Sequence, residues 1–397
     1  MAPVRGQGAL ASTNPSVVYT DRKGGINCHE RPRFEIAVIK GDGIGIDVTD
    51  AALAVIDAAR HRVGGFDFDC QDLLAGAGYF QETGRDMAPG AEEAAAAADA
   101  IFLGAIGLPA VRHADGTEMS PHLRLREIFQ LYAGVRPVKA YPNVPQRLAD
   151  PRAAEINLVI LRESTEGLFY SAAVHDRSPV ENDDEVQDLL RITRATTEKL
   201  HDFAFRLAQK RKSRGHKGMV TCVDKANVFR SMAFFRKIFD ERAGKFPDVE
   251  TAYSYVDAQA LELIRRPWDF DVLVMENMFG DILSDLAGGL VGGMGMAACA
   301  EIGTDHALFQ PAHGSAPDIM GEDRANPLAA ILSGAMMLDY LGDQFGHQPL
   351  ADTAQVIEDG IDDGFAANRI RPMEFGGDMG TRAVTKELID RIQSPRP

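Results

Sequence analysis

The apolar positions of the chain form short continuous runs that alternate with longer stretches of helical periodicity. Such runs predict buried strands, and apolar residues recurring every three or four positions predict amphipathic helices. The predicted strands are Phe34–Ile39, Ile101–Leu103, Ile156–Leu161, Gly218–Val223, Val249–Val256 and Phe270–Val274. The predicted helices are Asp47–Ala59, Ala91–Ala100, Glu185–Lys212, Phe229–Glu241, Ala325–Leu341 and Ala351–Asp362. This alternation favours an α/β fold with a large, mostly parallel or mixed sheet.

The length of 397 residues is typical of two domains or two lobes. No linker rich in Pro, Gly or Ser marks a simple boundary, so we expect the chain to cross between two lobes more than once. Residues 1–32 fit neither periodicity and are interpreted as a loosely structured N-terminal extension.

The composition of the chain limits which kinds of ligand and cellular partner the protein is expected to have. The formal net charge of -16 argues against a surface that binds nucleic acid or an anionic membrane. The longest nearly uncharged run, Leu286–Ala300, is shorter than the ~20 residues that cross a bilayer. The four cysteines show no C-x-x-C spacing, which excludes a typical zinc site or disulfide framework and predicts buried free thiols in a cytoplasmic protein.

Two aspartates open the helix predicted after the strand at Phe270–Val274. Asp281 and Asp285 are one turn apart and therefore share a helix face. An isolated pair of this kind is usually a solvated acidic face, but here an apolar strand precedes it and a nearly uncharged run follows. Hard oxygen ligands in such a place suit Mg²⁺ or Mn²⁺. We interpret the pair as part of a divalent-metal site.

The loop Gly41-Asp-Gly-Ile-Gly45 joins the first predicted strand to the first helix. It fails the dinucleotide fingerprint G-x-G-x-x-G, because Ile46 stands where the third glycine is required. A close approach of the backbone to a ligand and a tight packing turn are equally compatible with these glycines.

Basic residues gather in one part of this acidic chain, at Arg124, Arg126, Arg136 and Arg162. One arginine at the end of an apolar strand is usually a structural ion pair. Several favour carboxylate recognition, since guanidinium binds carboxylate bidentately. Together with a metal, they predict a small di- or tricarboxylic acid as ligand.

Two further strand ends carry charged residues, Lys225 and Asp257. Each alone is more typical of a surface ion pair. A lysine close to a metal acts as a base when the cation and burial depress its pKa.

A set of motifs occurs in one order along the chain: Gly41-Asp-Gly-Ile-Gly45, Arg136-Pro137, Arg162-Glu-Ser-Thr-Glu-Gly167, Asp224-Lys-Ala-Asn227, Tyr255-Val-Asp257, Glu276-Asn-Met-Phe-Gly-Asp-Ile-Leu-Ser-Asp285 and His313-Gly-Ser-Ala-Pro-Asp-Ile319. In this order they resemble the metal-dependent β-decarboxylating dehydrogenases, the isocitrate/3-isopropylmalate dehydrogenase family. The resemblance runs from about residue 34 to about residue 390. It implies an isopropylmalate dehydrogenase-like doubly wound fold of two lobes, with a cofactor-binding lobe at 33–131 and 292–397 and a dimerisation and substrate/metal lobe at 132–291.

The resemblance also implies roles for individual residues. The positions that match the substrate site are Ser120, Arg126, Arg136, Arg162 and Lys225. Asp281 and Asp285 match metal ligands, and Asp257 matches a third ligand given by the neighbouring subunit of a homodimer. Lys225, also from the neighbouring subunit, matches the general base. The positions that match the cofactor site are Asn227, His313, Gly314, Ser315, Ala316, Asp318, Ile319 and Asn326, and Asp318 resembles the acid of NAD-using members.

One departure concerns the catalytic acid. The family's tyrosine falls at Phe169 in this chain, with Tyr170 one position later. This departure leaves three alternatives open. Either Tyr170 replaces the missing acid, or another group supplies the proton, or the protein is catalytically impaired. The segment Asp115–Arg126, which selects the substrate, matches no single member of the family.

The sequence therefore predicts an NAD- and Mg²⁺- or Mn²⁺-dependent enzyme that oxidatively decarboxylates a malate-type 2-hydroxy acid. The candidate substrates are 3-isopropylmalate, isocitrate, homoisocitrate, tartrate and D-malate. The alternative is a non-catalytic relative that binds NAD or a carboxylate as a sensor. A plain 2-hydroxy-acid dehydrogenase without decarboxylation is disfavoured by Ile46 and by the metal aspartates.

Overall fold

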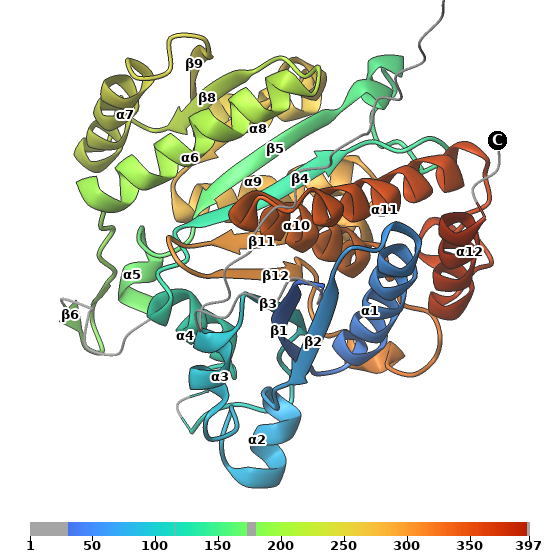
Figure 1. Ribbon diagram of the computed structural model, residues 1–397. Helices are drawn as coiled ribbons and strands as arrows, with labels where there is room; N and C mark the ends of the chain where they lie inside the picture. The colour runs from blue at the N-terminus through green and yellow to red at the C-terminus, as the bar shows by residue number, and fades with distance from the viewer. Residues whose placement is uncertain (1–30, 115, 173–179, 395–397) are drawn as a thin grey trace, which may run out of the picture.

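The computed structural model describes residues 31–114, 116–172 and 180–394, so the predicted N-terminal extension lies almost wholly outside the described residues. One mixed sheet runs through the centre, with the strand order β2-β1-β3-β12-β11-β4-β5-β10-β8-β9. Helices cover both of its faces (Figure 1). The predicted α/β class with a large mixed sheet is confirmed.

The strands of the central sheet change direction only near its middle. β11 is antiparallel to both of its neighbours, and β4 is antiparallel to β5, whereas the pairings toward both edges are parallel. The strands are β1 Arg33–Gly41, β2 Asp67–Asp72, β3 Ala100–Ala105, β4 Ala133–Lys139, β5 Asn157–Glu163, β8 Met219–Asp224, β9 Glu250–Tyr255, β10 Val272–Met275, β11 Ala298–Ile302 and β12 Ala307–Pro311. β6 Val180–Glu181 and β7 Val186–Gln187 form a separate antiparallel pair.

The helices divide between the two faces of the sheet because alternate strand residues point to opposite sides. On β1, Ile36 and Val38 belong to one apolar core, and Ala37 and Ile39 belong to another on the opposite face. The helices are α1 Ile44–Val63, α2 Ala77–Thr83, α3 Ala91–Ala97, α4 Pro121–Ile128, α5 Phe169–Ala172, α6 Arg194–Ser213, α7 Arg230–Ala243, α8 Val256–Arg265, α9 Asn277–Leu290, α10 Leu328–Phe345, α11 Gln348–Ala366 and α12 Thr381–Gln393.

Each face has its own set of helices. The side chains of α1, α6, α7, α10, α11 and α12 join the core on one face. On the opposite face, α3 and α4 cover one end of the sheet, and α8 and α9 cover the other. Helices that are distant in sequence are thereby brought together, as α1 and α12 are in Figure 1.

The order of the strands bears on the predicted lobes. One half of the sheet comprises β4, β5, β8, β9 and β10, which all come from residues 132–291, and the other half comes from the remainder of the chain. The division into two lobes stays a prediction. No helix in the described part of the chain is long and apolar enough to cross a membrane.

Several predicted helix boundaries are wrong, and the start of α6 differs most. The helix predicted from Glu185 begins at Arg194, where the Thr193 side chain accepts a hydrogen bond from the Thr196 amide. The preceding residues are extended because they bond elsewhere: Gly167 and Arg191 exchange two backbone hydrogen bonds. The helix predicted over Ala91–Ala100 ends at Ala97, since Ala100 opens the buried strand β3.

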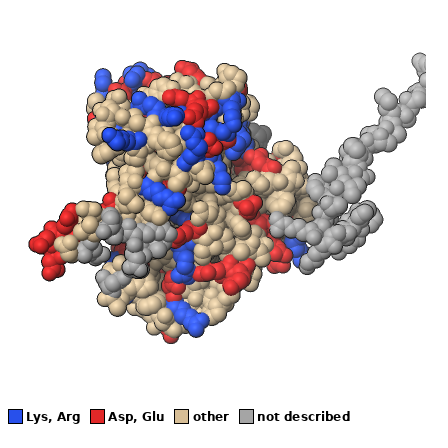
Figure 2. Space-filling model, turned by 90° about the vertical axis from the view of Figure 1, so that its left-hand side faces the viewer, with Lys and Arg blue, Asp and Glu red and all other residues tan. Residues whose placement is uncertain are grey.

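Of the cysteines in the described residues, Cys222 and Cys299 are buried free thiols as expected, whereas Cys70 on β2 is exposed. Acidic and basic side chains are interspersed over the face of the molecule in Figure 2.

Candidate active site

At the centre of the sheet, two charged side chains lie in one row of three neighbouring strands, with a glycine between them. Glu301 on β11 is opposite Gly134 on β4, which in turn is opposite Arg162 on β5. A Cβ atom at Gly134 would lie 2.7 Å from the Ser164 Oγ and 3.1 Å from the Glu301 Oε2. Glycine at this position therefore leaves room for the charged side chains on either side of it.

Arg126 enters the same place from α4. Its Nη2 lies 2.7 Å from the Glu301 Oε1, and both side chains are buried. Burial favours the neutral acid, but Arg126 and then Arg136 and Arg162 outweigh it and hold the pKa of the Glu301 carboxyl below its ordinary value. Glu301 is thus an anion inside a cluster of three arginines.

The two aspartates predicted as metal ligands face this cluster from α9. The helix begins where β10 ends, and the Glu276 side chain caps it by accepting bonds from the Met278 and Phe279 amides at 3.1 and 3.3 Å. This cap fixes the start of the helix, and Asp281 and Asp285 in its following turns face the arginines.

Ion pairs join the aspartates to two of the arginines. Arg162 pairs with the Asp281 Oδ1. Arg136 lies 3.7 Å from the Asp281 Oδ1 and 3.4 Å from the Asp285 Oδ1, and it donates a 3.0 Å hydrogen bond to the Ser284 Oγ. The structure therefore brings together Arg126, Arg136, Arg162, Asp281 and Asp285, as the sequence predicted.

Partial burial alters the protonation of these groups. Burial raises the pKa of the Asp285 carboxyl, and Asp281 adds to the increase against the opposing effect of Arg136. Burial and the proximity of Arg126 lower the pKa of Arg162 to about 10, so its guanidinium remains charged at neutral pH.

The cluster retains polar atoms that no protein group satisfies. The Nε atoms of Arg126 and Arg136 are buried and have no hydrogen-bond partner within the described residues. Buried polar groups are almost always paired, so these donors fit an acceptor from a ligand. A carboxylate has the charge and the geometry that guanidinium binds best.

Lys225 and Asp257 lie at neighbouring strand ends but apart from this cluster. Lys225 follows β8, Asp257 lies in the first turn of α8 after β9, and the two form an ion pair. The hydrogen bond from Lys225 lowers the pKa of the exposed Asp257 carboxyl. Within the described residues of one chain, no three His, Cys, Asp or Glu side chains gather where they could hold a metal. Asp257 is thus not brought to Asp281 and Asp285 by the single chain.

Phe169 and Tyr170 open the short helix α5, and they face different arginines. The guanidinium carbon of Arg162 lies 4.9 Å from the centre of the Phe169 ring. That of Arg191 lies 4.5 Å from the centre of the Tyr170 ring. Because the segment is helical and not extended, the two neighbouring rings do not point to opposite faces of a strand.

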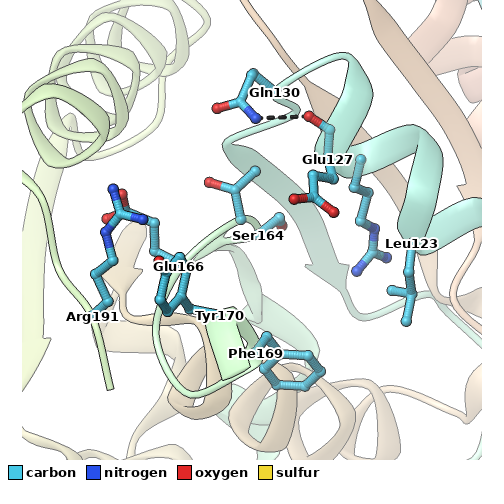
Figure 3. Close-up of a pocket in the computed structure, with 10 residues that line it drawn as sticks. Leu123, Glu127, Gln130, Ser164, Glu166, Phe169, Tyr170 and Arg191 are labelled. Carbon is cyan, nitrogen blue, oxygen red and sulfur yellow. Dashed lines mark hydrogen bonds between the residues drawn. The ribbon is translucent and has the colours of Figure 1, made fainter. Parts of the chain in front are cut away.

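A cavity of about 240 Å³ lies between α4 and α5, beside the arginine cluster. Its lining residues are Leu123, Arg126, Glu127, Gln130, Ser164, Thr165, Glu166, Phe169, Tyr170 and Arg191. In Figure 3, Leu123, Glu127 and Gln130 lie on the side formed by α4, and Glu166 and Arg191 lie on the opposite side. The cavity is therefore bounded by both apolar and charged side chains.

The remaining residues of α4 and of the turn before it have mixed outcomes. Ser120 is the N-cap residue of α4, and its hydroxyl donates to the Glu118 carbonyl at 3.4 Å. Arg124 pairs with Asp86 and Glu92 at 2.7 Å, so it is a structural ion pair rather than part of the cluster. Burial and Arg126 lower the pKa of His122 to about 3, which keeps its imidazole neutral.

The predicted cofactor residues lie on the loop that follows β12. Ser315 is buried, its carbonyl accepts a 2.7 Å hydrogen bond from the Ile44 amide, and Ala316 adopts φ 34°. The buried His313 Nε2 has no hydrogen-bond partner within the described residues, which fits an acceptor or donor on a bound adenosine.

Other predicted cofactor residues surround this loop. Gly314 and Asp318 are exposed, and Ile319 is half-buried. Asn326 is buried and donates a 2.9 Å hydrogen bond to the Glu374 Oε2. Asn227 is exposed in the turn after β8, beside Lys225.

The glycine-rich loop after β1 is a packing turn. A Cβ atom at Gly41 would lie 1.9 Å from the Ala105 carbonyl oxygen, and one at Gly43 would lie 2.0 Å from that of Ser315. Between them the buried Asp42 accepts 2.8 Å hydrogen bonds from the amides of Ala77, Gly78 and Gly107. The loop thus anchors the 313–319 segment to the start of α1.

The sequence analysis missed Glu301, Glu374 and Arg191. Glu301 had one detectable signal, because it is a single acid within the short apolar strand that follows the run Leu286–Ala300. Glu374 and Arg191 lie outside the recognised motifs, and only the folded chain brings them to the site.

Comparisons with known proteins decide the family. Residues 35–392 match the family described as isocitrate/isopropylmalate dehydrogenase. The chain belongs to this family. It is therefore an oxidoreductase of the isocitrate/isopropylmalate dehydrogenase class, and its recognition from the motif order is confirmed.

Individual relatives carry different substrate names. The chain is 38% identical to a 3-isopropylmalate/3-methylmalate dehydrogenase of Methanocaldococcus jannaschii, over 90% of this chain and 99% of the relative. It is 36% identical to a homoisocitrate dehydrogenase of the same organism, over 91% and 98%. A solved isocitrate dehydrogenase from Methylococcus capsulatus superimposes with a TM-score of 0.76 at 33% identity, over 91% of this chain and 100% of that one.

Proposed function

We propose that this protein is an NAD- and Mg²⁺- or Mn²⁺-dependent dehydrogenase that oxidises and decarboxylates a malate-type 2-hydroxy acid. The observation that carries the proposal is the convergence of Arg126, Arg136 and Arg162 on the two aspartates of α9. Carboxylate-binding cations and hard metal ligands meet at one place, as a chelated hydroxy acid requires.

The arginines bind and orient the acid. The Nε atoms of Arg126 and Arg136, which have no partner in the part of the chain that the structure describes, can donate to a carboxylate without displacing an existing hydrogen bond. Asp281 and Asp285 would hold a divalent ion, which would supply Lewis-acid stabilisation of the negative charge that develops in the reaction. Lys225 takes the hydroxyl proton at its Nζ when it is brought to the site.

NAD fits the loop after β12. Asp318 is exposed on this loop, and its carboxylate would accept hydrogen bonds from ribose hydroxyls but repel a 2′-phosphate. The His313 Nε2, which has no hydrogen-bond partner within the described residues, and the buried Asn326 amide would supply polar contacts for the adenine.

A homodimer completes the site. Lys225 and Asp257 pair with each other on the strand-end surface, away from Asp281 and Asp285. Large apolar side chains are exposed in the same region: Val228, Phe229, Leu261, Ile264 and Ile282. Exposed apolar surface of this extent marks an interface. A second copy seated on α8 and α9 would cover it and would carry Lys225 and Asp257 toward the partner's aspartates.

The rival interpretation is a non-catalytic relative that senses NAD or a carboxylate. Phe169 favours it, because a phenyl ring has no proton to give to the enol. The deciding experiment is a screen for NAD⁺ reduction with 3-isopropylmalate, isocitrate, homoisocitrate, D-malate and tartrate in the presence of Mg²⁺ or Mn²⁺. Turnover of any one of these acids would exclude the sensor interpretation. Tight binding together with no turnover of any of the five would support it.

A further inference from the structure

Glu301 is an acid within a site that is otherwise built to bind acids. Its side chain is fully buried, and its Oε1 lies 2.7 Å from the Arg126 Nη2 and 3.6 Å from the Cys299 Sγ. Its Oε2 has no hydrogen-bond partner within the described residues. The strand pairing places it on the same row as Arg162, with Gly134 between them.

This carboxylate changes the charge that the cluster offers to a ligand. Arg126, Arg136 and Arg162 together carry three positive charges, and Glu301 cancels one of them from within the protein. A buried charge is tolerated only when it is balanced. The cluster without Glu301 would balance one more carboxylate than the cluster with it.

The adjoining cavity does not restore the missing charge. Two acids, Glu127 and Glu166, line it together with Arg191, and Arg126 is already paired with Glu301. The rest of its wall is neutral and includes the apolar side chains of Leu123 and Phe169. A substituent that extends from the arginine cluster into this cavity therefore meets no excess of positive charge.

We propose that Glu301 is a specificity-determining residue that restricts this site to malate-type acids with two carboxylates and an uncharged group on C3. A third carboxylate is rejected because the arginine that would balance it is paired with Glu301. This inference rests on the proposed function, since it names which of the candidate acids the site accepts.

The test compares Glu301→Gln with the natural protein. Dissociation constants are measured by calorimetry in Mg²⁺ for two dicarboxylates, 3-isopropylmalate and D-malate, and for two tricarboxylates, isocitrate and homoisocitrate. Glutamine keeps the shape of the side chain and removes the charge. Glu93→Gln on the exposed face of α3 removes the same charge elsewhere and is the matched control.

The natural protein is expected to bind the tighter dicarboxylate at least tenfold better than either tricarboxylate. Glu301→Gln should shift that ratio toward the tricarboxylates by about tenfold or more, the size expected for one charge at ion-pair distance in a partly buried site. Glu93→Gln should leave the ratio unchanged. The ratio of two dissociation constants measured on one sample does not depend on the fraction of folded protein. Glu301→Asn, which also removes the charge, provides a second variant for the same measurement.

Two results would overturn the inference but not the proposed function. One is a preference of the natural protein for a tricarboxylate, which would show that Arg191 or Arg126 still serves a third carboxylate. The other is an unchanged ratio in both Glu301 variants, which would make the ion pair purely structural. Binding without NAD⁺ reduction would contradict the proposed function alone, since the ratio would still report on Glu301. Failure of all four acids to bind would overturn both.

Discussion

The guanidinium of Arg162 lies over the ring of Phe169, at 4.9 Å from the ring centre, whereas that of Arg191 lies over the ring of Tyr170. Successive residues of a helix point about 100° apart, so α5 cannot present both rings to the same arginine. The ring beside Arg162 therefore belongs to the residue that has no proton to donate.

We predict that Phe169→Tyr speeds turnover and that Tyr170→Phe is nearly silent. A hydroxyl on the ring beside Arg162 would supply an acid to the enol, whereas the Tyr170 hydroxyl points from a ring held by Arg191. The measurement is kcat for both variants on whichever acid the screen identifies. A loss of ~100-fold or more in Tyr170→Phe, typical of a lost general acid, would instead make Tyr170 the proton donor.

Asp281→Asn should lower both metal affinity and turnover, by at least about 100-fold in affinity, because a hard carboxylate ligand is lost. Mn²⁺ binding measured by electron paramagnetic resonance gives the affinity without relying on activity. Since the change also leaves the buried Arg162 without its partner, Tm is measured in parallel. Asp359→Asn on the exposed surface of α11 is the control. Full activity in excess chelator would contradict the metal assignment.

The ratio of kcat/KM for NAD⁺ to that for NADP⁺ should exceed about ten, because Asp318 and a 2′-phosphate are like charges. Asp318→Asn should reduce this ratio. Glu322→Gln removes an exposed charge from the same loop and should change the ratio little. Equal use of the two cofactors by the natural protein would place Asp318 away from the ribose.

Mixing two inactive variants tests the shared site. Lys225→Ala and Asp281→Asn should together recover up to about a quarter of natural activity, because half of randomly mixed dimers are heterodimers and each of these has one intact site. Lys225→Ala mixed with Asp257→Asn should recover nothing, since both groups are supplied to the same neighbouring site. No recovery in the first mixture, despite demonstrated exchange of subunits, would mean that each chain builds its own site.

His201 predicts a pH dependence of stability. Its ring is fully buried against Phe235 and Phe239, and burial lowers its pKa to about 3 from an ordinary value of 6.5. Between about pH 3 and pH 6.5 the unfolded chain binds a proton at His201 that the folded chain does not bind. The free energy of unfolding therefore has its full value above pH 6.5 and decreases as the pH falls below it. The slope from this group is about 1.4 kcal/mol per pH unit.

Replacing His201 with Phe should flatten that slope below pH 6.5. Both ring nitrogens of His201 lack hydrogen-bond partners within the described residues, so the replacement costs no polar contact at neutral pH. Urea denaturation of the two proteins between pH 7 and pH 5 measures the difference. Parallel curves over this range would show that His201 is protonated in the folded state.

The sequence by itself determined the class of fold, the family, and the arginines and aspartates that meet in the cluster. Apolar runs such as Phe34–Ile39 specify strands because they are buried on both faces of the sheet, and that requirement is local. The motif order identified the arginines and the α9 aspartates, because each motif is a strand end or a helix start whose geometry its own residues fix. The start of α6 was misplaced because it depends on bonds to Gly167 and Ser171 from a distant part of the chain.

Only the tertiary structure decided which charges meet. Glu301 lies in the row of Arg162 because β11 pairs with β4, an antiparallel pairing between strands far apart in sequence, and Arg126 reaches Glu301 from α4. Arg124 and Arg126 are neighbours on α4, yet one pairs at the surface and the other enters the cluster, because a helix turns them to different sides. The separation of Lys225 and Asp257 from Asp281 and Asp285 is likewise a property of strand order, which no local pattern encodes.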